Sequence, residues 1–325
     1  MRRITGLVLV GLGAFLVGAA ILSRVYVLDQ VRITPIDQFA QTVAPGTGTY
    51  FDPPTLSEKR SDLVARRRLK GDVAASNETT GVWDVSVVVQ TTDGALVRAT
   101  IDRVAFDRKS GESVHCCGEA VDAEPTPHEG MSYKFPFSTE KKTYQFWDVN
   151  SRRAFPAQYV SEEKIQGLTT YKFVQEIPTL ELQKQEVSGS LVGESTPSFQ
   201  APVMYSNKRT AWVEPTTGII VKGMEQARTT LQNSAGEDKV TVLQADLTFN
   251  EDTQKAQAKL ARDGITKINL VKWVVPIVGV VLGLAFVVVG LLLRRSRPGQ
   301  HTVGEHADIV LPAEEPEQLP PPRRA

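Results

Sequence analysis

Two long apolar segments lie at opposite ends of the chain and frame a polar region of about 250 residues. The first runs from Ile4 to Leu22 and the second from Trp273 to Leu293, and neither contains a charged side chain. A helix rises about 1.5 Å per residue, so about 20 apolar residues are needed to cross the roughly 30 Å hydrocarbon core of a bilayer. The pattern therefore predicts two transmembrane helices, at residues 4–22 and 273–293.

The basic residues that flank the two apolar segments are unevenly distributed. The terminal sides carry Arg2, Arg3, Arg294, Arg295 and Arg297, whereas the inner sides carry only Arg24 and Lys272. Because Lys and Arg beside spanning helices stay in the cytoplasm, we expect a plasma-membrane protein with both termini inside and residues 23–272 outside. Residues 1–3 and 294–325 are then cytoplasmic, and the proline- and acid-rich composition of 294–325 predicts a disordered tail.

A cleaved signal peptide is an alternative interpretation of the first apolar segment. Gly18 and Ala20 form a small-x-small pattern after a basic start, as signal peptidase sites do. We favour a retained span, because apolar residues continue to Leu28 without a polar stretch before the cut.

The region between the spans has mostly the period-two pattern of strands. β-branched and aromatic residues are concentrated in 82–91, 95–106, 143–149, 168–175, 209–213, 218–222 and 239–249. Asp93-Gly94 is a hairpin signal between the first two of these strands. A helix is expected at 253–260, with Gly264 interrupting its continuation toward the second span. We therefore predict a membrane-anchored, mainly-β (α+β) protein with one large antiparallel, barrel-like ectodomain between two transmembrane helices.

Small residues within the spans predict close helix packing. Ala14 and Gly18 form a small-xxx-small pair, and Gly279 and Gly283 form a GxxxG pair. Such pairs serve equally for contact between the two helices of one chain or between helices of two chains, so a homo-oligomer stays open. No ionisable residue lies within either span, which disfavours an ion or proton path along these two helices.

The two cysteines are adjacent, within His115-Cys116-Cys117-Gly118. In an oxidising compartment they can form a vicinal disulfide, bridge to another chain or remain free thiols. We favour the disulfide between Cys116 and Cys117. A metal site with His115 lacks a fourth ligand nearby and the usual spacing, so no metal is expected.

Charge and motifs exclude several function classes. The formal net charge of +0 argues against a nucleic-acid partner. No nucleophile elbow, phosphate loop or zinc helix occurs, so we expect neither an enzyme nor a cofactor. A local basic cluster is the candidate contact for anionic lipid or glycolipid headgroups. Its members are Lys59, Arg60, Arg66, Arg67, Arg68 and Lys70.

The segment Ala211 to Val221 contains a hairpin motif formed by Glu214, Pro215, Thr217 and Gly218. With the paired spans, the outward β domain and the Cys-Cys-Gly segment, it resembles an actinobacterial envelope family known both as a family of unknown function and as PorA-like porins. The resemblance covers residues 1 to about 297. The same motif and topology are more weakly similar to the class B scavenger receptors, the fatty-acid translocase family, whose barrel-shaped ectodomain holds an apolar tunnel.

The resemblances and the architecture lead to three functional hypotheses. The one we favour is a bacterial cell-envelope protein whose external β domain binds or transfers a lipid or another apolar envelope component. An oligomeric porin-like channel is the first alternative, although uncharged helices supply no obvious pore lining. A scaffold that binds a neighbouring envelope protein is the second.

Overall fold

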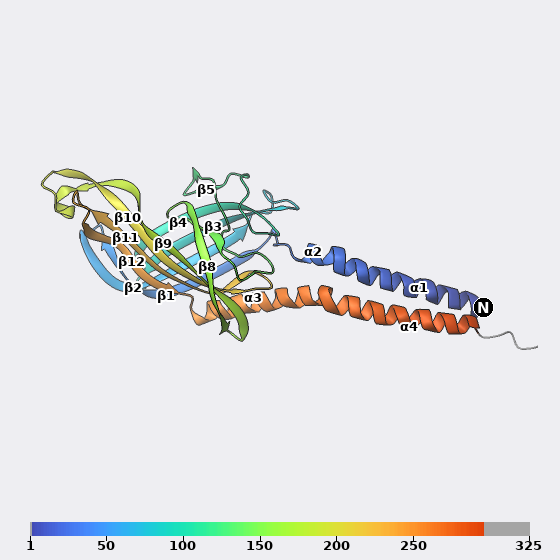
Figure 1. The fold of residues 1–325 in the computed structure, drawn as a ribbon. Helices are drawn as coiled ribbons and strands as arrows, with labels where there is room; N and C mark the ends of the chain where they lie inside the picture. Colours follow the sequence, from blue (N-terminus) through green and yellow to red (C-terminus); the bar gives the residue numbers. More distant parts are fainter. Residues whose placement is uncertain (1, 296–325) are drawn as a thin grey trace, which may run out of the picture.

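The structure is a computed structural model that describes residues 2–295, and it consists of a pair of long helices and a curled β-sheet (Figure 1). The helices leave the same end of the sheet and lie side by side along their length. The predicted disordered tail, apart from its first two residues, lies outside the described residues. The mainly-β architecture with two apolar helices confirms the predicted fold class.

The helical elements are α1 (Arg2–Leu22), η1 (Ser23–Val27), α2 (Leu28–Val31), η2 (Gly189–Val192), α3 (Glu251–Asn269), η3 (Leu270–Val274) and α4 (Val275–Arg295). The strands are β1 (Phe39–Asp52), β2 (Ser57–Gly71), β3 (Thr80–Thr91), β4 (Leu96–Asp107), β5 (Ala120–Val121), β6 (Glu124–Pro125), β7 (Tyr144–Asp148), β8 (Arg153–Ile165), β9 (Leu168–Ser188), β10 (Ser198–Glu214), β11 (Ile219–Gln232) and β12 (Asp238–Thr248).

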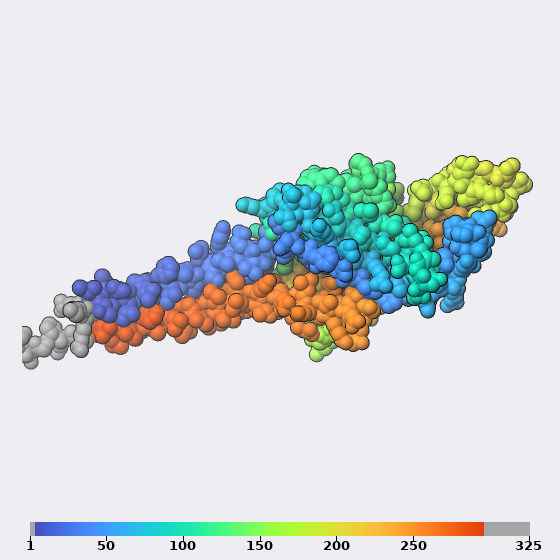
Figure 2. All heavy atoms as spheres, turned by 180° about the vertical axis from the view of Figure 1, so that it is seen from behind, coloured from blue at the N-terminus to red at the C-terminus, as the bar shows by residue number. Residues whose placement is uncertain are grey.

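The two long helices are each continuous through a short π segment. One candidate span covers Ile4–Val31 and the other lies within Glu251–Arg295, and both are long and apolar enough to cross a membrane. Figure 2 shows α1 and α4 side by side and in contact, with the β domain at one end. The second helix is much longer than the predicted span because α3 carries it on along the sheet.

Glycines let the backbones of α1 and α4 approach closely. A Cβ atom added at Gly13 would lie 2.5 Å from the carbonyl oxygen of Gly283, and one at Gly6 would lie 2.8 Å from that of Gly290. As the sequence of α1 advances from Gly6 to Gly13, the contacting residue of α4 moves back from Gly290 to Gly283, so the two helices are antiparallel. The small residues of α1 and α4 therefore support contact between the two helices of one chain.

The predicted packing residues are only partly those that make this contact. Gly279 and Gly283 both lie against α1. Ala14 and Gly18 are exposed, and a Cβ at Gly18 would meet nothing within 4 Å. The contact on α1 instead uses residues spaced by seven, Gly6, Gly13 and Ala20, as expected for helices that pack along a seam.

The π segments lie opposite each other where the helices leave the spans. Pro276 has no backbone N–H for the carbonyl of Lys272, and the π segment η3 lies just before it. The guanidinium of Arg24 donates to that carbonyl oxygen at 3.3 Å. Arg24 also lies over the ring of Trp273, at 4.7 Å from its centroid. A cation and an indole together are typical of a membrane–water interface.

Gly264 does not interrupt the helix, contrary to the prediction. The helix α3 begins after Asn250, whose side chain accepts a hydrogen bond from the backbone N–H of Thr253, and continues without a break to Asn269. A Cβ at Gly264 would lie 2.8 Å from Cγ2 of Thr217. Glycine at this position therefore allows close approach to the turn between β10 and β11 rather than ending the helix.

The sheet has 12 strands in the order β6-β5-β4-β3-β2-β1-β12-β11-β10-β9-β8-β7, with neighbouring strands antiparallel. Strands close in sequence are neighbours, and β1 joins β12. The sheet curls until its two ends are connected through residues 112–131. Isolated bridges pair Phe106 with Ser113, Glu112 with Met131, and Met131 with Phe146. The curled sheet is thus barrel-like and leaves a concave interior.

Candidate functional site

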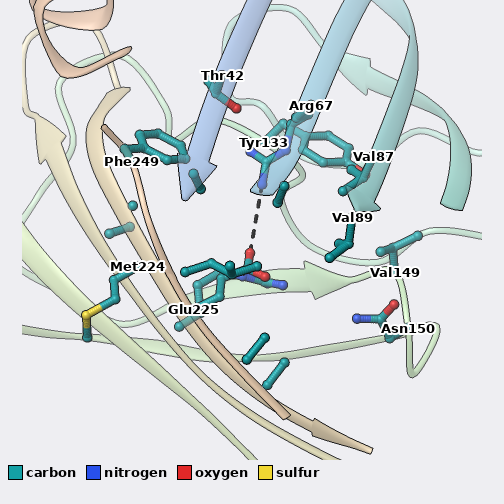
Figure 3. A pocket seen from close by; sticks show the side chains of 18 of the residues that line it. Thr42, Arg67, Val87, Val89, Tyr133, Val149, Asn150, Met224, Glu225 and Phe249 are labelled. Atoms are coloured by element: carbon teal, nitrogen blue, oxygen red, sulfur yellow. Dashed lines mark hydrogen bonds and ion pairs between the residues drawn. The ribbon is translucent and has the colours of Figure 1, made fainter. Parts of the chain in front are cut away.

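An inner cavity lies on the concave side of the sheet. Its volume is about 140 Å³, and its wall is mainly aliphatic and aromatic. Val87 and Val89 of β3 face it, with Leu243 and Leu247 of β12 on another side. Figure 3 shows Met224 and Phe249 bordering the same space. Alternation along each strand places these side chains inside and polar ones outside, which makes the interior apolar.

A second, helix-proximal cavity lies where the sheet meets the helices. Its volume is about 390 Å³, within the range of small-molecule pockets. The linker that follows α2 contributes Ile33 and Pro35, and α3 contributes Leu260 and Ile268. Because both elements continue directly into the apolar spans, this cavity lies next to the bilayer if the spans are inserted.

The two cavities share part of their walls. The residues that line both are Thr42, Arg67, Tyr133, Ile220 and Phe249. They come from β1, β2, β11, the loop before β7 and the end of β12. The cavities are therefore adjacent, and together they extend from the helix end of the sheet into its interior.

Charged side chains cross the interior at the junction. Figure 3 shows Arg67 reaching from β2 toward Glu225 of β11, with 3.8 Å between Nη2 and Oε1. Glu225 also accepts from Nε of Arg209 at 2.9 Å, and Arg209 pairs with the fully buried Asp148 at 3.1 Å. Burial by itself raises the pKa of Glu225, but the charges of Arg209 and Arg67 outweigh it and hold the pKa below its ordinary value.

Tyr133 separates the cavities and is held in place by a buried network. Its hydroxyl donates to Asp102, and the other oxygen of Asp102 lies 2.7 Å from Nε2 of His128. Nδ1 of His128 lies 3.2 Å from Glu119. Desolvation lowers the pKa of His128, yet the hydrogen bonds and charges of Asp102 and Glu119 raise it above the ordinary value. The backbone of Tyr133 is left-handed, with φ of 63°, which is a strained conformation for an aromatic residue.

Lys134 follows Tyr133 and faces the helix-proximal cavity. Its side chain is buried, with 8 % of the residue exposed. Nζ donates to Oγ1 of Thr34 at 3.0 Å and lies 4.0 Å from the centroid of the Phe137 ring. Desolvation lowers the pKa of Lys134 to about 7.

The predicted hairpin motif connects β10 to β11 and supports the loop that carries Tyr133 and Lys134. The buried carboxylate of Glu214 accepts from the backbone N–H groups of Thr216 and Thr217, each at 2.9 Å, and from the Thr217 hydroxyl at 2.6 Å. The carbonyl of Pro215 accepts from the backbone N–H of Thr139 at 2.8 Å. The motif is therefore a structural turn, and its residues contribute to the site mainly by positioning a loop.

Cys116 and Cys117 are joined to each other in the structure. They lie in the bridging segment 112–131, where Nε of Arg103 donates to the carbonyl of Cys117 at 3.0 Å. Arg103 in turn pairs with Asp72 and Asp84 at 2.8 and 2.6 Å. The cysteine turn is thus anchored to strands β3 and β4, away from the residues that line the two cavities.

The six residues of the basic cluster lie along β2 and do not share one face. Arg67 points into the interior and lines both cavities, whereas Arg66, Arg68 and Lys70 are exposed on the opposite face. Lys59 and Arg60 lie at the other end of the strand, roughly 36 Å from Lys70 at 3.3 Å per residue. A headgroup contact that uses all six at once is incompatible with this arrangement, because of the alternation and length of the strand.

Sequence reasoning missed the most distinctive residue of the site. Lys134 stands in the segment Tyr133-Lys134-Phe135-Pro136-Phe137, where a single cation is surrounded by aromatic residues. A lone charge in such a run is the signal that marks it for burial. Thr34, its partner, carries no comparable signal, since it is about 100 residues away in sequence.

The family model of Porin PorA matches residues 5–292, which include both helices and the whole sheet. The chain belongs to the Porin PorA family. A Porin PorA of Corynebacterium resistens is 23% identical, covering 93% of this chain and 99% of that relative. A Porin PorA of Corynebacterium amycolatum is also 23% identical, covering 90% of this chain and 99% of the relative.

Membership in the Porin PorA family confirms the actinobacterial resemblance. Together with the two apolar helices, it identifies a membrane protein. Neither the family match nor the two relatives bear on the similarity to class B scavenger receptors, which stays a prediction. The name of the two relatives, Porin PorA, favours the channel alternative over the lipid hypothesis.

Proposed function

We propose that this member of the Porin PorA family binds an apolar envelope molecule within its curled sheet, receiving it from the adjacent membrane leaflet. The observation that supports this most directly is the pair of adjoining apolar cavities, the larger of which is walled by the linker after α2 and by α3. Moving a hydrocarbon chain from a bilayer into water costs about 0.8 kcal/mol for each CH₂ group that becomes exposed. A cavity beside the spans supplies an apolar environment without a step through water.

The proposal includes the orientation predicted from the basic flanks. Arg2 and Arg3 begin α1, and Arg294 and Arg295 end α4, so the helix ends far from the sheet are the cytoplasmic ones. The sheet then lies outside the plasma membrane. Protease added to sealed cells should remove the sheet domain and leave fragments the size of the anchors. Survival of the sheet domain, together with activity of a reporter that works only in the cytoplasm and is fused to this domain, would overturn this orientation.

The binding proposal is tested by extraction of the purified full-length chain with organic solvent, followed by mass spectrometry. We expect a lipid to co-purify with the wild type. Thr42 lines both cavities, so Thr42→Trp should fill the junction and reduce the amount bound at least severalfold. Val160→Trp is the matched control, since Val160 is 56% exposed and outside both cavities. Absence of lipid from the wild type, with no uptake of added fatty acid, contradicts the proposal.

A porin-like channel formed by several chains is the second candidate, and it is favoured by the name that the two relatives bear. Within the described residues the strongest polar feature of the interior is the group of Arg67, Arg209 and Glu225. A channel along the concave surface would pass these residues. Planar bilayers loaded with the purified chain should then conduct, and Arg67→Ala should change the ion selectivity. Silent bilayers at high protein load would remove this candidate.

A further inference from the structure

Lys134 is a buried cation without a carboxylate partner in the described part of the chain. No carboxylate oxygen of residues 2–295 lies within ion-pair distance of its Nζ atom, and its hydrogen bond is to the neutral hydroxyl of Thr34. An ammonium group has three donors. Besides the Thr34 hydroxyl, the ammonium has, among the described residues, only the face of the Phe137 ring beside it, and Lys134 lines the helix-proximal cavity.

Other deeply buried ionisable groups of the described chain either have a charged partner or, like Glu214, accept three hydrogen bonds, whereas Lys134 makes a single one. His128 lies between Asp102 and Glu119. Asp148 is paired with Arg209. Burying a charge without an opposite charge beside it costs several kcal/mol in general. A buried charged group that has no opposite charge in the protein therefore marks a site where a ligand can supply that charge.

The position of Lys134 in the cavity limits what can supply that charge. Thr34 lies in the linker just beyond α2, so the ammonium is at the helix end of the cavity. The other ionisable groups that line the cavity are Asp37, Arg67, Tyr133, Asp263 and Lys267. Arg67 and Tyr133 also line the inner cavity, so they stand where the two cavities adjoin. The rest of the wall is largely apolar, including Leu69, Trp83 and Phe249.

We propose that the molecule bound in the helix-proximal cavity is a long-chain carboxylic acid whose carboxylate pairs with Nζ of Lys134. The Thr34 hydroxyl remains within reach as a second polar contact, and the alkyl chain follows the apolar wall toward Phe249 and the inner cavity. One negative charge balances the single unpaired ammonium. This inference rests on the proposed function and specifies the class of its ligand.

The test compares ligands of equal chain length on the delipidated full-length protein in detergent. Hexadecanoate, hexadecanol and methyl hexadecanoate share the hydrocarbon chain and differ in charge. We expect the wild type to bind hexadecanoate at least tenfold more tightly than the two neutral ligands. Lys134→Met keeps roughly the length of the side chain and removes the charge, so it should abolish the preference for hexadecanoate over hexadecanol. Lys134→Arg should retain the preference, and the exposed Lys70→Met should behave as the wild type.

The outcomes separate this inference from the proposed function. Equal affinity of the wild type for hexadecanoate and hexadecanol, or a preference that persists in Lys134→Met, would overturn the role of Lys134 while hydrocarbon binding stands. Binding of phosphatidylglycerol but not hexadecanoate, lost in Lys134→Met, would overturn the carboxylic acid in favour of a phosphate headgroup. No binding of any of these ligands removes both proposals. If Lys134→Met does not fold, as judged by circular dichroism, the ligand series on the wild type still decides.

Discussion

The backbone N–H of Phe135 donates a hydrogen bond to the carbonyl oxygen of Gly218 at 2.9 Å. The contact joins the turn between β10 and β11 to the loop that carries Tyr133 and Lys134. Gly218 has a φ of 74°, and a Cβ at this position would lie 2.0 Å from the carbonyl oxygen of Phe135. The turn therefore requires glycine for its conformation and for the close approach, and the loop of the candidate site is held by it.

Gly218→Ala should destabilise the chain strongly. A left-handed backbone costs an alanine roughly 1 kcal/mol, and the clash with Phe135 adds an overpacking cost, for a total of about 3 kcal/mol or more. Thermal unfolding in detergent measures the difference. Gly236→Ala is the matched control, because Gly236 has a φ of 76° and nothing within 4 Å of its Cβ position. Equal effects of the two variants would show that the contact with Phe135 contributes nothing.

Close helix packing predicts a difference between two glycines of α1. Gly13→Ile places a branched side chain where a Cβ already meets the Gly283 carbonyl at 2.5 Å, so the helices must separate. We expect a loss of roughly 1 to 3 kcal/mol in the free energy of unfolding. Gly18→Ile enters open space and should change it little. Melting temperatures of both variants in the same detergent make the comparison, and a reversed order would contradict the antiparallel pairing of the helices.

The buried ion cluster around Arg209 should be intolerant of losing its cation. Arg209→Met leaves the fully buried Asp148 and the neighbouring Glu225 without their main partner. Removal of one member of a buried pair costs about 3 to 5 kcal/mol. Arg228→Met is the control, since its pair with Asp238 is exposed and worth less than about 1 kcal/mol. Urea unfolding followed by tryptophan fluorescence measures both, and similar losses would disprove the special role of Arg209.

The lowered pKa of Lys134 predicts that the free energy of unfolding of the delipidated chain increases with pH. Its pKa is about 7 in the fold because of burial and 10.5 ordinarily, so between these values the unfolded chain binds a proton that the folded chain does not. The free energy of unfolding of the wild type, relative to Lys134→Met, should rise on the order of 3 kcal/mol from pH 7 to pH 10. Below pH 7 both states are protonated and the difference should be constant. Parallel pH profiles of wild type and variant would refute this assignment.

His128 should make the free energy of unfolding fall as the pH rises, which is the opposite of the effect of Lys134. The carboxylates of Asp102 and Glu119 raise its pKa in the fold above 6.5 in spite of burial. The stability that this group adds is fully present below about pH 6.5 and is lost as the pH rises through the folded-state value. The advantage of the wild type over His128→Asn should therefore be larger at pH 6 than at pH 9. Equal advantages of the wild type at the two pH values would contradict this prediction.

Local patterning along the chain was sufficient for the spans, most strands and several turns. Two uninterrupted apolar runs specify helices in a bilayer because no other local structure satisfies their backbone there. The strand predictions at β3, β4, β7 and β12 match the structure closely, since alternation on a half-buried sheet is visible in sequence. The strands β1, β2 and β8 and the two-residue strands β5 and β6 were missed. In β2 the run of arginines concealed the alternation, although every second residue faces inward.

Long-range contacts determined the rest, because they join residues whose local sequences carry no record of each other. Lys134 meets Thr34 across about 100 positions, and Gly264 packs against Thr217 instead of ending its helix. Which glycines of α1 face α4 depends on how the helices are rotated, and this is set by the packing of both. The curl of the sheet, which creates the two cavities, likewise follows from pairings between its distant ends rather than from any single strand.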